Sequence, residues 1–258
     1  MTFRLILEIE PPRAPDLSKV ARQLDIFGPL VDAILVPDNH LARPAVSSVA
    51  LAVEIRRAGF QAIPAVNARD RNHLRLRSDL MTLQAYGVEE VLFLYGDRIA
   101  HGRSALTVRE MLGDEAGAGL RRGVVATIGR PLAWRRRADF LVTKLAFGRS
   151  KAGYWREAEG FAHSLYCGVI ALPDGEMARR VVENIPDLEP PPGYIDAFDT
   201  DPDAGFHAAI AELDELHAAG IDGAHLVVPA GRRRFAEMLE AWIASKRSRS
   251  GEAARLAR

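Results

Sequence analysis

One carboxylate in this sequence stands in an unexpected place. Glu8 follows the apolar run 5–7 and precedes the pair Pro11-Pro12, so it lies at the end of a segment typical of a buried strand. A carboxylate is costly to bury unless it has a partner or takes part in chemistry. We therefore regard Glu8 as the residue with the clearest indication of chemical use.

Six further polar residues follow apolar runs that are typical of strands: Asp38, Asn39, Asn67, Asp70, Asp97 and Lys144. In a protein with parallel strands, the residues at the strand ends converge on one side of the sheet. Turn geometry alone also favours Asp and Asn after a strand, so each of these has a purely structural interpretation as well. Lys144 lies between Thr143 and Leu145, and this register predicts a buried side chain rather than a solvated one.

The elements that position these residues alternate between strand and helix along the whole chain. Short apolar runs predict eight strands, at 3–9, 32–36, 62–66, 88–95, 123–128, 139–143, 168–172 and 224–228. A helix-like segment follows each strand, several of them with apolar residues at helical spacing, including one at 155–162. Parallel strands need helical crossovers and eight strands can close a sheet, so we expect an α/β fold, a single (β/α)8 TIM-type barrel, over residues 1–244.

A doubly wound open sheet is the alternative fold. The sequence has no turn resembling GxGxxG and no GxxxxGK[ST] phosphate loop, which weakens the nucleotide-binding versions of that alternative. Ser47, Asp174 and Asp201 are expected to cap helices. Residues 245–258 are rich in Arg, Ser and Ala, and we expect a basic, disordered C-terminal tail there.

The composition excludes several classes of protein. Lys plus Arg and Asp plus Glu both total 34 among 258 residues, so net charge gives no reason to expect nucleic acid or a membrane as partner. No segment is typical of an export signal or a membrane span. The single cysteine, Cys167, excludes an intrachain disulfide, favours a cytoplasmic setting and is expected to be a buried structural thiol.

The histidines give no indication of a metal site, whereas one run of arginines has both a functional and a structural interpretation. None of the seven histidines pairs with carboxylates at metal-ligand spacing, so we expect no metal site. The run 232–234 is more simply explained as a solvated helix end, although it follows the last expected strand, where barrels often bind phosphate or other anions. A homo-oligomer is possible.

The order of several short motifs resembles the methylenetetrahydrofolate reductase family. The motifs are Glu8-Ile-Glu-Pro-Pro-Arg13, Pro37-Asp38-Asn39, Ala68-Arg-Asp-Arg-Asn72, Ser78-Asp79-Leu80, Leu94-Tyr-Gly-Asp97 and Asp139-Phe-Leu-Val-Thr-Lys144, and they are densest from Phe3 to Asp97. The resemblance implies a (β/α)8 barrel that reduces 5,10-methylenetetrahydrofolate to 5-methyltetrahydrofolate, in one-carbon metabolism and methionine biosynthesis. It implies that Glu8 is the general acid that opens the five-membered ring. Asp97 would favour the resulting cation, and Asp38, Asn39, Asn67, Asp70 and Lys144 would bind the pterin substrate.

The sequence departs from this family where the flavin is usually held. Pro37 stands in place of a Thr, Ala65 in place of a His, and Ile128-Gly129-Arg130 in place of Tyr-Pro-Glu. Lys144 replaces a folate-contacting Gln. These departures argue against FAD as the cofactor and resemble relatives that pass hydride directly from NADH or NADPH to the substrate, which requires the two rings to stack in one ternary complex.

Two other functions remain open from the sequence. The chain could be a folate- or pterin-binding relative that has lost catalysis. It could also be a reductase or methyl-transfer enzyme that acts on another one-carbon carrier or uses a deazaflavin.

Overall fold

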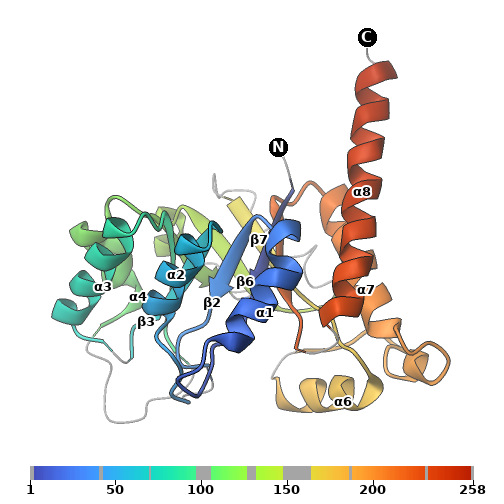
Figure 1. Cartoon of the computed structure of the whole chain (residues 1–258), viewed down its shortest axis with the longest axis horizontal. Coiled ribbons are helices and arrows are strands. Elements are labelled where there is room, and N and C mark those ends of the chain that lie inside the picture. Colours follow the sequence, from blue (N-terminus) through green and yellow to red (C-terminus); the bar gives the residue numbers. More distant parts are fainter. Residues whose placement is uncertain are drawn as a thin grey trace.

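The eight strands of the protein close into a single parallel barrel in the order β1 to β8, as the sequence predicts. The structure is a computed structural model that describes residues 3–40, 43–69, 71–96, 106–126, 132–147, 164–185, 188–229 and 232–256, with side chains up to residue 246. The strands are β1 Arg4–Glu8, β2 Ala33–Val36, β3 Ala62–Asn67, β4 Glu90–Leu94, β5 Arg121–Ala126, β6 Phe140–Leu145, β7 Ser164–Ile170 and β8 Gly223–Val227. Figure 1 shows helices packed around the outside of these strands. The fold is therefore a (β/α)8 barrel.

Seven α-helices lie among the described residues. They are α1 Ser18–Phe27, α2 Ser48–Arg57, α3 His73–Ala85, α4 Val108–Gly113, α6 Gly175–Asn184, α7 Ala204–Ala218 and α8 Arg232–Leu256. Short 3-10 helices lie at η1 Gly28–Leu30, η3 Glu115–Gly117, η4 Ala133–Arg137 and η5 Asp196–Asp199. The helix expected at 155–162 lies outside the described residues, and β7 begins four residues earlier than the sequence suggests.

Side chains inside the barrel close its amino-terminal end. Arg4 reaches across to Glu90, with nitrogen to oxygen distances of 2.9 and 2.5 Å, and Arg121 binds the same carboxylate. Above this layer an apolar core fills the barrel, and Gly123 provides the space for the ring of Phe140 because a Cβ there would lie 2.1 Å from the ring. The interior of the barrel is therefore filled by side chains, and active sites of such barrels lie at the carboxyl ends of the strands.

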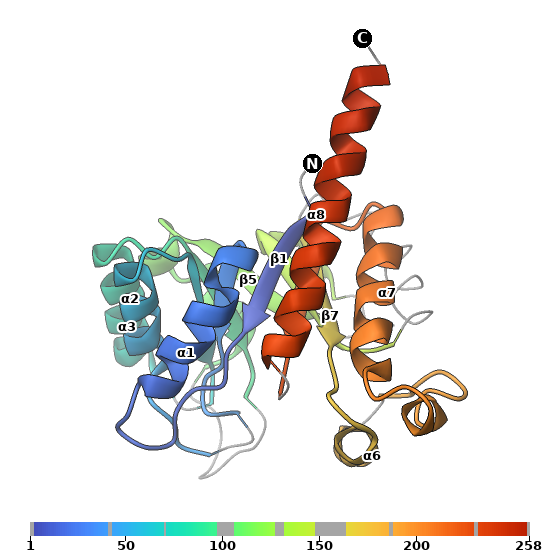
Figure 2. The same cartoon turned by 45° about the vertical axis from the view of Figure 1, so that its right-hand side comes forward.

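The carboxyl ends of the strands face the same side of the molecule as α6. In Figure 2 the arrowhead of β1 points to this side, where α8 also begins, and the two chain termini lie at the other side. A separate apolar cluster, which includes Leu172 and Tyr194, packs α6 and η5 beside the ends of β6 and β7. The mouth of the barrel therefore has one wall built from the segment that follows β7.

The helix ends match the sequence in part. Asp174 caps α6 by accepting a hydrogen bond from the backbone N–H of Met177 at 2.7 Å, as expected. Ser47 occupies the N-cap position of α2 without a capping bond from its side chain. Asp201 does not cap α7, which begins at Ala204, because its carboxylate binds His207 and the backbone N–H of Asp203.

The last helix differs from the sequence prediction. α8 runs as one helix from Arg232 to Leu256, through most of the segment 245–258 for which a disordered tail is expected. Figure 1 shows its C-terminal turns extending beyond the barrel. Cys167 is buried, as predicted. No helix within the described ranges is long and apolar enough to cross a bilayer.

Candidate functional site

Glu8 and His225 form a hydrogen-bonded pair at the mouth of the barrel. Glu8 is the last residue of β1, and its Oε2 lies 3.0 Å from Nε2 of His225 on the adjacent strand β8. The side chain of Glu8 is 21% exposed and that of His225 is 9% exposed. Nδ1 of His225 is buried and has no hydrogen-bond partner among the described residues. This pair is the kind of partnership that a carboxylate in an apolar strand requires.

His225 is not among the site residues predicted from the sequence, although it is, like Glu8, a titratable residue in an apolar strand. His225 lies within the apolar strand Gly223–Val227 and is nearly buried. A titratable side chain in such a run indicates either a buried partner or a use in chemistry. Its partner is 217 residues away in the sequence, so the pairing itself becomes visible only in the closed barrel.

A cavity of about 340 Å³ opens at the mouth and contains Glu8. Its walls come from the segments after β1, β2 and β8, from the start of α8 and from Met177 on α6. The lining residues are Glu8, Ile9, Glu10, Pro11, Arg13, Pro37, His40, Arg43, Ala45, Met177, Val227, Val228, Pro229 and Arg232. This volume is within the range of small-molecule sites, and the lining combines apolar side chains with several charged ones.

Glu10 lies in the same cavity but is held by cations. Its carboxylate binds Lys19 at 2.5 Å and Arg232 at 3.5 Å. Partial burial acts against the charged form, yet Lys19, Arg232 and Arg13 together hold the pKa of Glu10 below its ordinary value. Glu10 is therefore an ionised structural partner, whereas Glu8 has only the imidazole beside it in the hydrogen bonds described.

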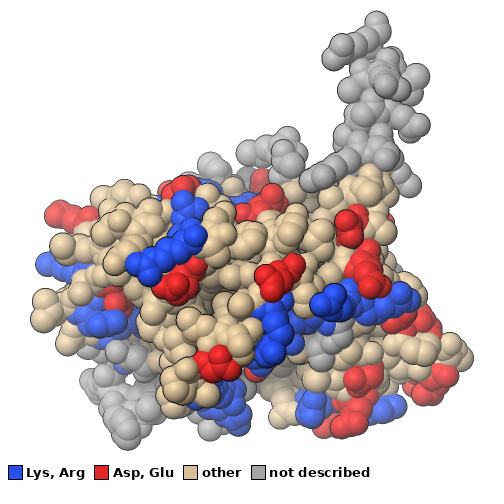
Figure 3. All heavy atoms as spheres, viewed as in Figure 1, with Lys and Arg blue, Asp and Glu red and all other residues tan. Residues whose placement is uncertain are grey.

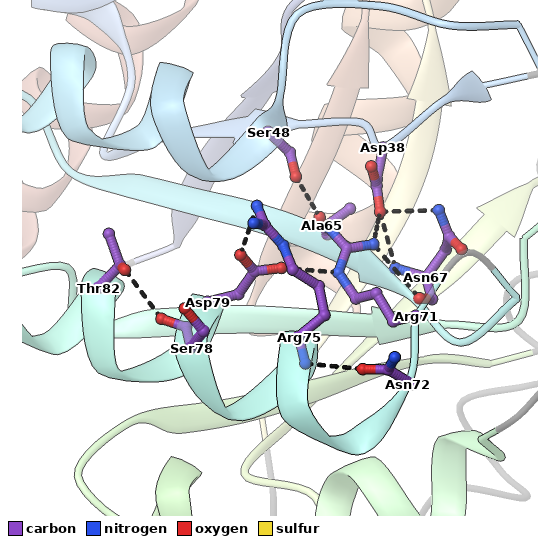
Figure 4. Close-up of polar contacts among 10 residues, drawn as sticks. All are labelled: Asp38, Ser48, Ala65, Asn67, Arg71, Asn72, Arg75, Ser78, Asp79 and Thr82. Atoms are coloured by element: carbon purple, nitrogen blue, oxygen red, sulfur yellow. Dashed lines mark hydrogen bonds and ion pairs between the residues drawn. The ribbon is translucent and has the colours of Figure 1, made fainter.

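Asp38 and Asn67 belong to an internal network that fastens α3 to the barrel. Figure 4 shows Arg71 between Asp38 and Asp79. Arg71 binds Asp38 directly and donates from Nε to Asp79 at 2.8 Å, while Asp38 also accepts from the backbone N–H of Asn67 at 2.9 Å and from its side-chain amide at 2.7 Å. Burial favours the neutral form of Arg71, but the two carboxylates raise its pKa above the ordinary value. We call this set, with Arg75 bound to Asp79, the Arg71 clamp.

The other predicted site residues have different surroundings. Asn39 has a positive φ of 49° and its side-chain oxygen accepts from the backbone N–H of Ala45 at 3.3 Å, which shapes the loop after β2. The prediction that Lys144 is buried is wrong: the residue is exposed, next to an irregularity in the β6–β7 pairing between Val142 and Leu145 that breaks the regular register. Asp70 and Asp97 lie outside the described residues.

Comparison with known proteins gives structural neighbours only. No family model and no curated protein matches the sequence. An uncharacterized protein from Clostridium thermocellum that binds two copies of 5-methyl-5,6,7,8-tetrahydrofolic acid shares 11% identity at a TM-score of 0.66, with 93% of each chain covered. A mutant tryptophan synthase alpha-subunit from the hyperthermophile Pyrococcus furiosus shares 13% identity at a TM-score of 0.56, covering 93% of this chain and 96% of that one. These likenesses show the barrel fold alone.

The structure describes two of the positions at which the sequence departs from the flavin-binding members of the family that it resembles. Pro37 lines the cavity and offers neither a side-chain hydrogen bond nor a backbone N–H. Ala65 is fully buried in β3, and its carbonyl accepts a hydrogen bond from Ser48 Oγ at 2.7 Å. Neither position therefore offers a side-chain hydrogen bond to a flavin. The segment 128–130 lies outside the described residues.

Proposed function

We propose that this protein is a methylenetetrahydrofolate reductase-like oxidoreductase that transfers hydride directly from NADH or NADPH to 5,10-methylenetetrahydrofolate. The observation that carries the proposal is that Glu8, hydrogen-bonded to His225, lines a ligand-sized cavity at the carboxyl ends of the strands. Catalytic groups of (β/α)8 enzymes lie at this end of the barrel. The resemblance in sequence assigns the role of general acid to the same residue.

Glu8 performs the acid step in this proposal. Transfer of its proton to N10 of the substrate breaks the bond between N10 and the bridging carbon and leaves a cationic iminium at N5. Bound NADH would supply the hydride that converts this carbon into the 5-methyl group. Glu8 then regains a proton from water, so the balance is one hydride and one proton for each methyl group formed.

His225 positions the acid. We place the shared proton on Nε2, because a proton on Nδ1 would leave a buried N–H donor without a partner among the described residues. Nε2–H then donates to Oε2 of Glu8 at 3.0 Å, which leaves Oε1 to carry the transferable proton. An imidazole that is only 9% exposed on the neighbouring strand can hold the carboxyl group in one orientation.

The cavity that contains Glu8 offers apolar surface on which a flat ring can pack. Ile9, Pro37 and Val227 line the same cavity as Glu8 and contribute this apolar surface. Apolar walls exclude water from a cationic intermediate and allow two rings to lie close together. The lack of a side-chain hydrogen bond to a flavin at Pro37 and Ala65 supports hydride transfer without FAD. The predicted electrostatic role of Asp97 stays a prediction.

An absorbance spectrum and a steady-state assay test the proposal. We expect a purified protein without flavin absorbance that oxidises NADH or NADPH only when 5,10-methylenetetrahydrofolate is present. Glu8→Gln should lower kcat by about 100-fold or more, since general acids contribute about 10²–10⁴-fold. The control Glu54→Gln, in an exposed pair with Arg57 on α2, should retain wild-type kcat. Unchanged kcat in Glu8→Gln would refute the mechanism, and a tightly bound flavin would refute the direct transfer.

A second candidate is a folate-binding protein without catalytic activity. The neighbour from Clostridium thermocellum, which binds 5-methyltetrahydrofolic acid on the same fold, favours it. Calorimetry that detects tetrahydrofolate binding, together with no oxidation of NADH, NADPH or a reduced deazaflavin, would support this candidate over the reductase. Turnover with a reduced deazaflavin alone would instead support the use of that donor.

A further inference from the structure

The cavity at the barrel mouth carries a rim of cationic side chains. Arg13 follows β1, Arg43 follows β2 and Arg232 is the first residue of α8, and all three line the cavity. Arg13 and Arg43 are exposed, whereas the side chain of Arg232 is 21% exposed. In Figure 3, which has the view of Figure 1, Lys and Arg side chains gather between the lower ends of α1 and α8. We call these three arginines the cationic rim.

The positive charge of the rim exceeds what the nearby carboxylates can balance. Glu10 already binds Lys19 at 2.5 Å and Arg232 at 3.5 Å. Glu8 faces His225. Within the described part of the chain, Arg13 and Arg43 have no ion pair within 4.0 Å, and the N-terminus of α8 adds a partial positive charge. The rim therefore has unused capacity for an anion.

We propose that the cationic rim binds the acidic end of an extended ligand whose reacting end lies at Glu8. This inference rests on the proposed function in taking Glu8 as the reacting end. A cavity of about 340 Å³ is near the lower limit for ligand sites, so a long ligand must project its tail past the rim into solvent. Arginines that are exposed in the free protein are then in the right place to bind that tail.

The chemistry of the rim selects two neighbouring negative charges. A guanidinium binds carboxylate or phosphate oxygens through two parallel hydrogen bonds, and three guanidinium groups at one edge suit a doubly charged group. The two carboxylates of a glutamyl tail and the pyrophosphate of a dinucleotide both meet this description. The same site would therefore recognise either the tail of the pterin substrate or the phosphates of the hydride donor.

Calorimetry with matched ligands distinguishes these sources. The variant combines Arg13→Gln with Arg43→Gln and spares Arg232, which holds Glu10. Tetrahydrofolate is compared with a tetrahydropterin that lacks the glutamyl tail, and NADH is compared with reduced nicotinamide mononucleotide. The control is Arg57→Gln at the end of α2, which removes an exposed arginine away from the cavity. We expect the variant to bind one tailed ligand about tenfold more weakly and its short analogue as the wild type does.

Each outcome decides the inference. Weakened binding of tetrahydrofolate identifies the glutamyl tail, and weakened binding of NADH identifies the pyrophosphate. The inference would be overturned if wild type and variant bound the tailed ligands with equal affinity, or if the variant lost as much affinity for the short ligands as for the tailed ones. It would also be overturned if the wild type bound neither tailed ligand. Failure of the proposed function is distinct, since a protein that binds tetrahydrofolate through these arginines but never oxidises NADH or NADPH refutes the reductase and keeps the rim.

Discussion

The Arg71 clamp allows a sharp test of how the barrel mouth is held together. Arg71→Met keeps much of the length of the side chain and removes its charge. The side chains of Arg71, Asp38 and Asp79 are 8%, 5% and 3% exposed, so the substitution leaves two buried carboxylates without their shared cation. Breaking a buried pair by removing one partner typically destabilises a protein by about 3–5 kcal/mol.

The remaining contacts set the expected loss at the lower end of that range. Asp38 keeps two hydrogen bonds from Asn67, and Asp79 keeps Arg75 at 2.9 Å. We therefore expect a loss of about 3 kcal/mol. An unfolding entropy of about 2.1 cal/mol/K per residue gives about 0.5 kcal/mol/K for a chain of this length, so Tm should fall by about 6 °C.

Differential scanning calorimetry measures this loss directly. The control is Arg57→Met, because Arg57 forms an exposed pair with Glu54 at 2.9 Å and such pairs contribute about 0.2–1 kcal/mol. Its Tm should fall by about 2 °C or less. If Arg71→Met loses no more than this control, the clamp does not stabilise the fold. In that case, the variant Asp38→Asn tests whether Asp38 binds the substrate. A substrate-binding role predicts that this variant has a higher KM for the pterin and an unchanged Tm.

Two further variants test the pair at the mouth and the packing inside the barrel. His225→Gln should lower kcat and leave KM for the pterin unchanged, because His225 acts through Glu8. For the same reason, adding His225→Gln to Glu8→Gln should cause no further loss in kcat. Additive losses in steady-state assays would contradict this prediction. Gly123→Ala should destabilise the fold by about 1–3 kcal/mol, because the added Cβ would overlap the ring of Phe140. Adding Phe140→Leu should restore part of this loss. A wild-type midpoint for Gly123→Ala in chemical denaturation would contradict the described packing.

The fold was accessible from the sequence because each element is encoded locally. The runs of apolar residues, their lengths and the turn residues between them predict eight strands in the right order, and the structure joins all eight into one closed barrel. The cap at Asp174 was likewise predictable, because a cap depends only on residues three positions apart. The failed cap at Asp201 shows the limit: its carboxylate binds His207 instead, a local competitor that a capping rule does not weigh.

The side-chain contacts within the candidate site could not be predicted from the sequence in the same way. Glu8 could be selected because an acid in an apolar strand needs a partner, but the identity of that partner depends on β1 lying beside β8. Lys144 was misjudged because an irregular pairing between β6 and β7 breaks the alternation on which its burial was predicted. Arg71 follows a strand by only four residues, yet its contacts to Asp38 and Asp79 join three separate segments.

Two adjacent residues that follow β2 show why a polar residue at a strand exit is weak evidence of a site. Pro37 lines the cavity, while Asp38 turns to Arg71 and helps to hold α3 against the barrel. Successive side chains of a strand point to opposite faces, so one position separates the ligand side from the helix side. Glu8 also lines the cavity, and it meets His225 through a hydrogen bond between the ends of β1 and β8. We therefore expect a substitution of Glu8 to alter the chemistry of the ligand site alone. The kinetic effect of a substitution of Asp38 must first be corrected for the stability that the protein loses.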